Sequence, residues 1–236
     1  ALTPSTRERL LFDYIPYLKV AQEEHDRFAE TLRENGVEVI YYVEETAKAL
    51  KTKELRQQLV DEFLTLARLT SDGVRYNLTN YLMSMEPEEM VRKLIGGIKK
   101  NEIPSDDIRS LMDLIHDYYP YISDPMPNLY FTRDPGACVG KGINIHHMHT
   151  RERMRESLLL KYMFKYNRDF ATEENGQWYD VYDDYSIEGG DVLVPTKDMV
   201  AIGLSQRTTI AGIEAFAKKL LTKSSYKKVL VFDIPK

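Results

Sequence analysis

Apolar residues between positions 16 and 35 recur at the three- and four-residue spacing of an amphipathic helix. Gly36 follows this segment, at a place where a glycine commonly ends a helix. The next stretch, 37–43 (VEVIYYV), is rich in β-branched and aromatic residues, which predicts a buried strand. Helix, glycine and apolar strand in this order are typical of an α/β unit.

The pattern changes between residues 45 and 119, where apolar positions keep a helical period and no strand is expected. Pro87 suits the first turn of a helix, and Ser105 suits the cap before one. Gly96 and Gly97 indicate close contact between two helices, because glycine otherwise weakens a helix. We therefore predict an all-helical insertion over 45–119. Its helices are expected over 52–69, 74–85, 87–102 and 106–119.

Strand patterns return after residue 125. The expected elements are a strand over 142–148, a hairpin over 192–205 that turns at 196–198, a helix over 208–223 and a buried strand over 229–234. The chain is therefore predicted to be an α/β protein. Residues 1–44 and 120–236 would form the α/β domain, into which the helical bundle is inserted.

Charge and hydropathy exclude several classes of protein. The formal net charge is −5 and the isoelectric point is about 5.7, so the chain lacks the basic surface of a nucleic-acid-binding protein. No apolar run approaches the roughly 20 residues that span a membrane, and the first residues do not resemble a signal peptide. The single cysteine, Cys138, excludes an internal disulfide, and we expect a cytoplasmic protein.

The segment 125–135 (PMPNLYFTRDP) is the first candidate for chemistry. Its three prolines exclude a helix interior, yet its apolar side chains are unusual for an idle surface loop. Asp134 could receive a guanidinium or amine, and Phe131 could cover the apolar part of such a ligand. Asn128 and Arg133 complete this candidate group. The alternative is a structural loop in which Arg133 pairs locally with Asp134.

Two further motifs carry charged side chains at the ends of predicted strands. In 188–191 (EGGD), two glycines let a backbone or ligand approach closely between Glu188 and Asp191. Arg207 follows a strand, where its guanidinium could hold a carboxylate with two hydrogen bonds. The alternatives are an ordinary Gly-Gly turn with solvated acids and a surface arginine near a helix cap.

The histidines and the cysteine are weaker candidates. Residues 146–149 (HHMH) hold three histidines, but a strand would point His147 and His149 to one side and His146 to the other. Catalytic zinc usually gathers ligands from separated segments, so we expect no metal here. Cys138 is a nucleophile in principle, but its neighbours in sequence supply no partner group.

Four motifs occur in an order and spacing that is similar to one enzyme family. They are MPNLYFTRDP, MHTRERMRE, IEGGDVLV and GLSQRT, and the opening LTPSTRERLLFDYIPYLKVAQEEH also fits. In this combination the chain resembles arginine deiminase over essentially its whole length. The resemblance implies hydrolysis of L-arginine to L-citrulline and ammonia through a covalent amidino–cysteine intermediate, without a metal or organic cofactor. It also implies a pentein-type, guanidine-modifying α/β propeller, incomplete in this chain, with the helical insertion.

The resemblance assigns roles to matching positions. Asp134 resembles the carboxylate that holds the guanidinium and assists proton transfer, and Glu188 resembles the residue that orders the catalytic histidine. Asp191 is a secondary candidate. The substrate-binding positions implied are Leu11 as an apolar wall, and Asn128, Phe131, Arg153 and Arg207 at the amino-acid end of arginine. The two arginines would face the substrate carboxylate.

The resemblance also implies groups that this sequence does not contain. The family's nucleophilic cysteine and acid–base histidine come later in the chain, and Cys138 does not occupy the nucleophile position. We therefore expect residues 1–236 alone to be inactive. The complete protein is expected to be a homo-oligomer that acts on free L-arginine.

Two other interpretations stay open. The chain could belong to a relative that acts on another guanidino compound, although the pair Arg153 and Arg207 argues against agmatine, which has no carboxylate. It could also be a truncated, non-catalytic paralogue that binds arginine or a protein partner.

Overall fold

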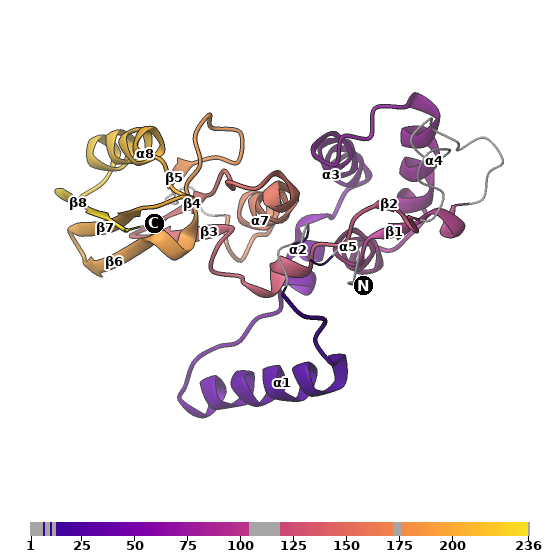
Figure 1. Cartoon of the computed structure of the whole chain (residues 1–236), viewed down its shortest axis with the longest axis horizontal. Coiled ribbons are helices and arrows are strands. Elements are labelled where there is room, and N and C mark those ends of the chain that lie inside the picture. Colours follow the sequence, from indigo (N-terminus) through magenta and orange to yellow (C-terminus); the bar gives the residue numbers. More distant parts are fainter. Residues whose placement is uncertain (1–6, 8–9, 11–12, 104–118, 172–175, 236) are drawn as a thin grey trace.

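The computed structural model describes residues 7, 10, 13–103, 119–171 and 176–235. Helices and short sheets form a mixed α/β architecture, with most helices to one side, two sheets to the other and α7 between them (Figure 1). The helices are α1 Leu18–Glu34, α2 Tyr42–Ala49, α3 Lys53–Leu66, α4 Asp72–Met83, α5 Pro87–Gly96, α7 Met154–Tyr166 and α8 Ile210–Lys223. The strands are β1 Ile98–Lys99, β2 Tyr121–Ser123, β3 Gly136–Val139, β4 Gly142–Ile145, β5 Gly176–Tyr179, β6 Val192–Thr196, β7 Met199–Leu204 and β8 Lys228–Asp233. Short 3-10 turns are η1 Lys100–Glu102, η2 Pro127–Tyr130, η3 Arg151–Arg153 and η4 Gly189–Asp191.

Helices α2 to α5 pack around one apolar core that also receives α7. Phe63 of α3 and Leu78 of α4 are fully buried, and Leu158 and Tyr162 of α7 enter the same core. Pro87 begins α5, as predicted. Helices α2 to α5 therefore share one core with α7, a helix of the predicted α/β part. Within the described part of the chain, no helix is long and apolar enough to cross a membrane.

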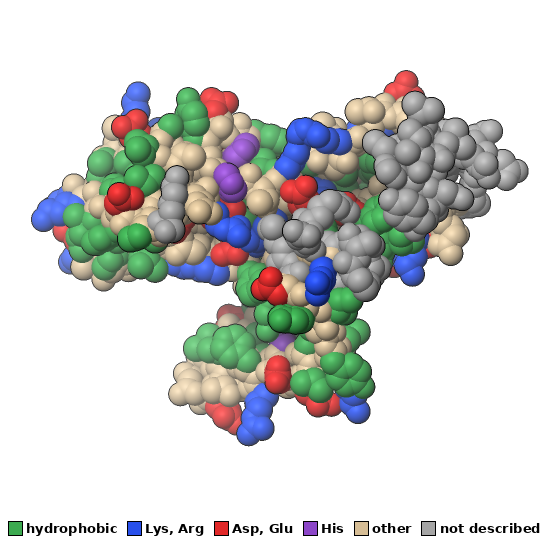
Figure 2. Space-filling view, viewed as in Figure 1, with side chains coloured by type: hydrophobic (Ala, Val, Ile, Leu, Met, Phe, Trp, Pro, Cys, Tyr) green, Lys and Arg blue, Asp and Glu red, His purple; other side chains and the backbone are tan. Residues whose placement is uncertain are grey.

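Helix α1 confirms the period predicted near the N-terminus, and Gly36 ends it with a left-handed φ of +78°. Several of its large apolar side chains are nevertheless exposed. Ala29 is buried, but Leu18 and Phe28 are exposed. The helix lies apart from the other helices (Figure 1), and hydrophobic side chains are visible on its surface (Figure 2).

The predicted strand over 37–43 is wrong. Residues 37–41 have no regular secondary structure, and α2 begins at Tyr42. Val37 and Ile40 are exposed, and the described strands do not pair with this stretch. The Tyr42 hydroxyl instead donates to the carbonyl of Glu156 at 2.9 Å, which ties the start of α2 to α7. A β-prone composition forms no strand without a neighbouring strand to pair with.

The predicted helix over 87–102 is too long. Helix α5 ends at Gly96, and β1 follows and pairs with β2. Gly97 has a φ of +82°, and a Cβ there would lie 2.7 Å from the backbone nitrogen of Pro125. The expected helix–helix contact is therefore wrong, because the glycine allows an irregular segment to approach. The predicted cap Ser105 and helix over 106–119 lie outside the described residues, except for position 119.

The two larger sheets repeat one topology. Strands β3 and β4 form an antiparallel hairpin, and α7 connects β4 to the parallel strand β5. Strands β6 and β7 form a second hairpin, and α8 connects β7 to the parallel strand β8. This confirms the predicted hairpin at 192–205 and the helix at 208–223. We call residues 134–179 unit one and residues 188–233 unit two, so that each unit includes the few residues just before its first strand.

The closing strands of the two units differ in burial. Trp178 and Tyr179 of β5 are buried in a core that includes Ile213 and Phe216 of α8. In β8, by contrast, Val231 and Phe232 are more than half exposed. The prediction of a buried strand at 229–234 is therefore correct for the strand and wrong for its burial in this chain.

Candidate active site

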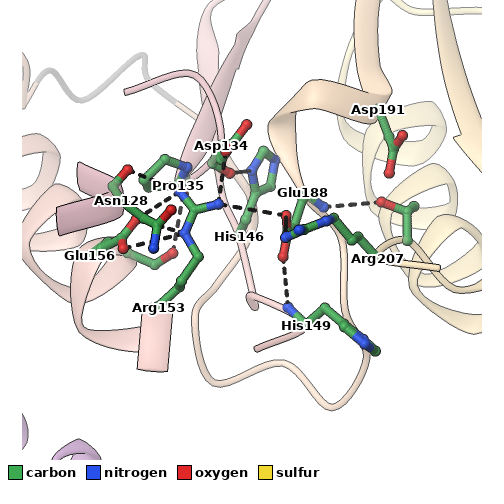
Figure 3. Close-up of polar contacts among 12 residues, drawn as sticks. Asn128, Asp134, Pro135, His146, His149, Arg153, Glu156, Glu188, Asp191 and Arg207 are labelled. Carbon is green, nitrogen blue, oxygen red and sulfur yellow. Dashed lines mark hydrogen bonds and ion pairs between the residues drawn. The ribbon is translucent and has the colours of Figure 1, made fainter. Parts of the chain in front are cut away.

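Each unit carries an acidic residue before its first strand and an arginine between its second strand and its helix. In unit one, Asp134 precedes β3, and Arg153 ends η3 at the start of α7. In unit two, Glu188 precedes η4 and β6, and Arg207 lies between β7 and α8. Figure 3 shows these four side chains gathered in one cluster. The tertiary structure thus brings four predicted site residues together from distant segments.

The two acidic loops are joined through their backbones. Gly189 donates its N–H to the carbonyl of Asp134 at 3.0 Å. A Cβ at Gly189 would clash with the carbonyl of Arg133, so this close approach requires glycine. The carboxylate of Glu188 accepts the backbone N–H of His149 at 3.0 Å. The EGGD motif therefore holds the loop of unit two against the loop of unit one.

The guanidinium of Arg153 is buried and faces three carboxylates. Its Nη1 donates to Oδ2 of Asp134 at 2.8 Å and lies 3.9 Å from Oε2 of Glu188. Its Nη2 donates to Oε2 of Glu156 at 2.9 Å. Burial disfavours the charged guanidinium, but the hydrogen bonds to Glu156 and Asp134 raise the pKa of Arg153. Arg153 consequently stays charged and orients the acidic groups around it.

The role of Glu156 was missed by sequence reasoning. Its side chain is buried, and burial raises the pKa of Glu156 to about 7, against the opposite effect of Arg153. Glu156 stands three residues after Arg153, the spacing at which side chains on a helix meet. The signal was therefore present in the motif 151–156 (RERMRE), as an arginine and an acid on one helical face.

Arg207 belongs to the same cluster but has a different environment. Its Nη1 donates to Oε2 of Glu188 at 3.1 Å, and 45% of its side chain is exposed. Its backbone N–H donates to Oγ of Ser205 at 3.0 Å. The interpretation as a surface arginine near a cap is thus incomplete, because Arg207 pairs with a buried acid. Its exposed part can still meet an anionic group from solvent.

Asn128 borders the cluster through its backbone. Its carbonyl accepts a hydrogen bond from Nη2 of Arg153 at 3.3 Å. Its side-chain amide donates to the carbonyl of Leu10 at 2.6 Å, so that amide is engaged with the N-terminal segment. Leu11, the predicted apolar wall, lies outside the described residues.

Phe131 and Asp191 lie outside the hydrogen bonds and ion pairs described above. Phe131 is half exposed and meets Tyr130 edge-on, with ring centroids 5.4 Å apart. Asp191 accepts a hydrogen bond from Oγ of Ser205 at 2.7 Å, and Figure 3 places it beyond Glu188. The side chain of Phe131 therefore presents a half-exposed apolar surface. Asp191 helps to hold the loop of Arg207 through Ser205.

Two of the local alternatives are wrong. Arg133 does not pair with Asp134, since its guanidinium donates to the carbonyl of Val192 and Asp134 pairs with Arg153. Glu188 is not a solvated acid of an ordinary turn, because its side chain is buried and paired.

Cys138 lies apart from the charged cluster. It lines a cavity of about 330 Å³ whose walls include Lys141, Lys161 and Phe164, and none of the four clustered residues lines that cavity. Although Cys138 is exposed, surrounding protein raises the pKa of its thiol, which lowers the supply of thiolate. Within the described residues, no group of three or more His, Cys, Asp or Glu side chains is placed to hold a metal ion.

Comparison with known proteins gives a consistent family. The family model described as arginine deiminase matches residues 8–236. An arginine deiminase of Clostridium perfringens is 45% identical over 238 residues, which cover 99% of this chain and 58% of that protein. An arginine deiminase of Bacillus cereus is 45% identical over 236 residues, which cover 100% of this chain and 58% of that protein.

A likeness to solved structures is much weaker. The crystal structure of a dimethylarginine dimethylaminohydrolase adduct with 4-chloro-2-hydroxymethylpyridine is 21% identical, with a TM-score of 0.39. The overlap covers 47% of this chain and 41% of that one. It is too slight to support an argument about the fold.

The fold and the cluster define a mixed α/β protein in which paired carboxylates surround a guanidinium. The chain belongs to the arginine deiminase family. It spans 58% of the length of the two curated relatives described above.

Proposed function

We propose that the complete protein hydrolyses L-arginine to L-citrulline and ammonia in the cytoplasm. The observation that carries the proposal is the meeting of Asp134 and Glu188, from two separate units, around one guanidinium. Their carboxylate oxygens lie 2.8 and 3.9 Å from the same nitrogen of Arg153. The loops therefore already have the spacing of a guanidinium-binding pair, in a chain of the arginine deiminase family.

The proposed roles follow from charge and exposure. A guanidinium is planar and always charged near neutral pH, so paired carboxylates can orient it and draw its charge away from the carbon under attack. Asp134 and Glu188 would do this for the substrate, and Asp134 would also assist proton transfer. Arg207, which is partly exposed, would hold the substrate carboxylate. The resemblance implies that Arg153 also binds the substrate carboxylate. In this structure, however, the guanidinium of Arg153 is paired with Asp134 and Glu156.

The rest of the site is proposed from the resemblance. Leu11, Asn128 and Phe131 would contact the apolar and amino-acid parts of arginine, with Asp191 as a secondary candidate. The attacking thiol and the acid–base histidine would come from the part of the family's length that this chain does not span. The reaction would need no metal or organic cofactor.

The architecture of the complete protein is also a proposal. Units one and two would be two modules of a pentein-type α/β propeller built from residues 1–44 and 120–236, with the helical bundle of 45–119 inserted. Repetition of the ββαβ topology supports this arrangement. The complete protein would form a homo-oligomer.

Citrulline production tests the proposal. In a protein extended to the full length of its relatives, Asp134→Ala should lower kcat by about two orders of magnitude or more, the scale of lost acid–base or electrostatic assistance. Asp184→Ala is the control, because Asp184 is an exposed aspartate in the loop between β5 and η4, outside the charged cluster. Residues 1–236 alone should make no citrulline above background.

Either of two results would contradict the proposal. The extended Asp134→Ala protein could keep its turnover within a few-fold of the unaltered protein. Residues 1–236 could also turn over arginine in a way that alkylation of Cys138 abolishes, which would make Cys138 the nucleophile.

A further inference from the structure

His146 occupies the junction between the two acidic loops. It follows β4 directly, and its side chain is fully buried. Its Nδ1 lies 2.7 Å from the carbonyl oxygen of Asp134, and its Nε2 lies 3.0 Å from the side-chain amide nitrogen of Asn144 (Figure 3 shows His146 beside Asp134). The histidine thus has a defined partner on each ring nitrogen.

Chemistry determines which nitrogen carries the proton. A carbonyl oxygen can only accept, so Nδ1 must donate its hydrogen to Asp134. In a neutral ring Nε2 must then accept, and the Asn144 amide supplies the donor. Burial lowers the pKa of His146 to about 4, although the carbonyl of Asp134 opposes this shift. The ring is therefore neutral at physiological pH, in a single tautomer.

The carbonyl that His146 binds is also the carbonyl that joins the two loops. The oxygen of Asp134 accepts both Nδ1–H of His146 and the backbone N–H of Gly189 at 3.0 Å. A Cβ at Gly189 would lie 3.1 Å from Cε1 of His146, so the imidazole packs directly against the EGGD backbone. A shift of the imidazole would therefore move both Asp134 and the loop that carries Glu188.

We propose that His146, held in its Nδ1–H tautomer by Asn144, is a positioning residue that fixes the Asp134 carboxylate relative to Glu188. The imidazole touches no ligand in this role and acts only through the Asp134 backbone. The inference rests on the proposed function in so far as Asp134 is catalytic. The anchoring of Asp134 by His146 involves only residues of this chain, so it can be tested without measuring turnover.

Two substitutions at His146 distinguish loss of the hydrogen bond to Asp134 from loss of packing, because the asparagine and leucine side chains have the same number of non-hydrogen atoms. In His146→Asn, the amide nitrogen stands the same number of bonds from Cβ as Nδ1 does and can donate to Asp134. In His146→Leu, no donor is present. The matched control is His147→Leu, because Nδ1 of His147 also lies at a backbone carbonyl, that of Val181 at 3.0 Å, outside the charged cluster.

Kinetics in the protein extended to the family's full length give the first readout. His146→Leu should lower kcat about tenfold or more and change KM by less than about threefold, because misplacement of a catalytic group affects the transition state more than binding. His146→Asn should restore kcat to within about threefold of the unaltered protein. Unchanged kcat in His146→Leu, or equal losses in both variants, would overturn the proposal.

Amide hydrogen exchange of residues 1–236 gives the second readout, which needs no activity. The N–H of Gly189 should exchange about tenfold faster in His146→Leu and at nearly the original rate in His146→Asn and His147→Leu. If the extended protein has no deiminase activity but this pattern holds, the proposed function fails and the anchoring stands. If Gly189 exchanges at one rate in all variants, the anchoring fails whatever the activity.

Discussion

Units one and two have the same order of elements and the same strand pairing, yet the arginines at equivalent positions differ in burial and in their ion pairs. Arg153 and Arg207 both lie between the second strand and the helix of their units. The side chain of Arg153 is 4% exposed and faces three carboxylates, whereas that of Arg207 is 45% exposed and pairs with Glu188. Equivalent positions in a repeated topology therefore do not have equivalent energetics.

The difference comes from what packs on each unit. Unit one lies between the helical core and unit two, because α7 enters the core of α2 to α5 and α8 covers β5. The described residues provide no such cover for β8, whose apolar side chains remain exposed. Local topology is thus repeated, while burial depends on the neighbours of each unit.

The largest effect expected from this comparison is on stability. Arg153→Gln should lower the free energy of unfolding by about 3–5 kcal/mol, because it leaves buried carboxylates without their cation. Arg207→Gln should cost less than about 1 kcal/mol, because the Arg207 side chain is 45% exposed and the buried Glu188 keeps the backbone N–H of His149 as a partner. Urea unfolding of residues 1–236 measures both. Equal losses would show that the two arginines are energetically alike and that the contrast in burial is without consequence.

The second effect concerns pH and the buried histidine of unit one. His146 has a folded pKa of about 4 and an unfolded pKa of about 6.5. Between these values the unfolded chain takes up a proton that the folded chain excludes, so stability falls as pH falls. The charges of Asp134 and Asp191 oppose the lowering of the His146 pKa, and the charge of Arg133 adds to it.

At about pH 5 the unaltered chain should have lost about 2 kcal/mol more than His146→Asn, relative to about pH 7. Other titrating groups, including Glu156, cancel in this difference between two variants. Urea unfolding at several pH values checks it. If the free energy of unfolding depends on pH in the same way in the two proteins, the folded chain does not exclude a proton from His146.

The third effect concerns recognition by the exposed arginine of unit two. In the extended protein, Arg207→Ala removes a charge-assisted contact worth roughly 1.5–3 kcal/mol. It should chiefly raise KM for arginine, with a smaller loss of kcat. The preference for arginine over agmatine should narrow, since agmatine has no carboxylate. Steady-state kinetics on both substrates test this, and equal losses for both would assign Arg207 to the fold instead.

The smallest effect concerns the exposed closing strand of unit two. An uncovered apolar edge strand favours self-association, so Phe232→Ser should raise the concentration at which residues 1–236 associate by about fivefold, or about 1 kcal/mol. Tyr76→Ser, which removes an exposed aromatic ring from α4, is the control and should change little. Sedimentation measures both variants. If the unaltered chain is entirely monomeric and unfolds in a sharp thermal transition, the exposed strand β8 does not drive self-association.

Much of the local structure was predictable because it depends on neighbours in sequence. Helical periods located α1, α3, α4 and α8, and the turn at 196–198 located the hairpin of β6 and β7. The secondary-structure predictions are wrong where the local conformation depends on contact with a segment that is distant in sequence. Residues 37–43 have strand composition but no strand beside them, and Gly97 ends a helix because Pro125 approaches from another segment.

The sequence by itself determined the periodic elements, the family and the identities of the charged residues Asp134, Glu188, Arg153 and Arg207. The tertiary structure alone decided that Arg153 is buried among acids while Arg207 meets solvent, that Glu156 joins the cluster, and that His146 supports Asp134. The physical reason is that ion-pair energies and pKa values depend on distance and desolvation. Both quantities are set by which distant segments pack together, and a linear pattern does not contain them.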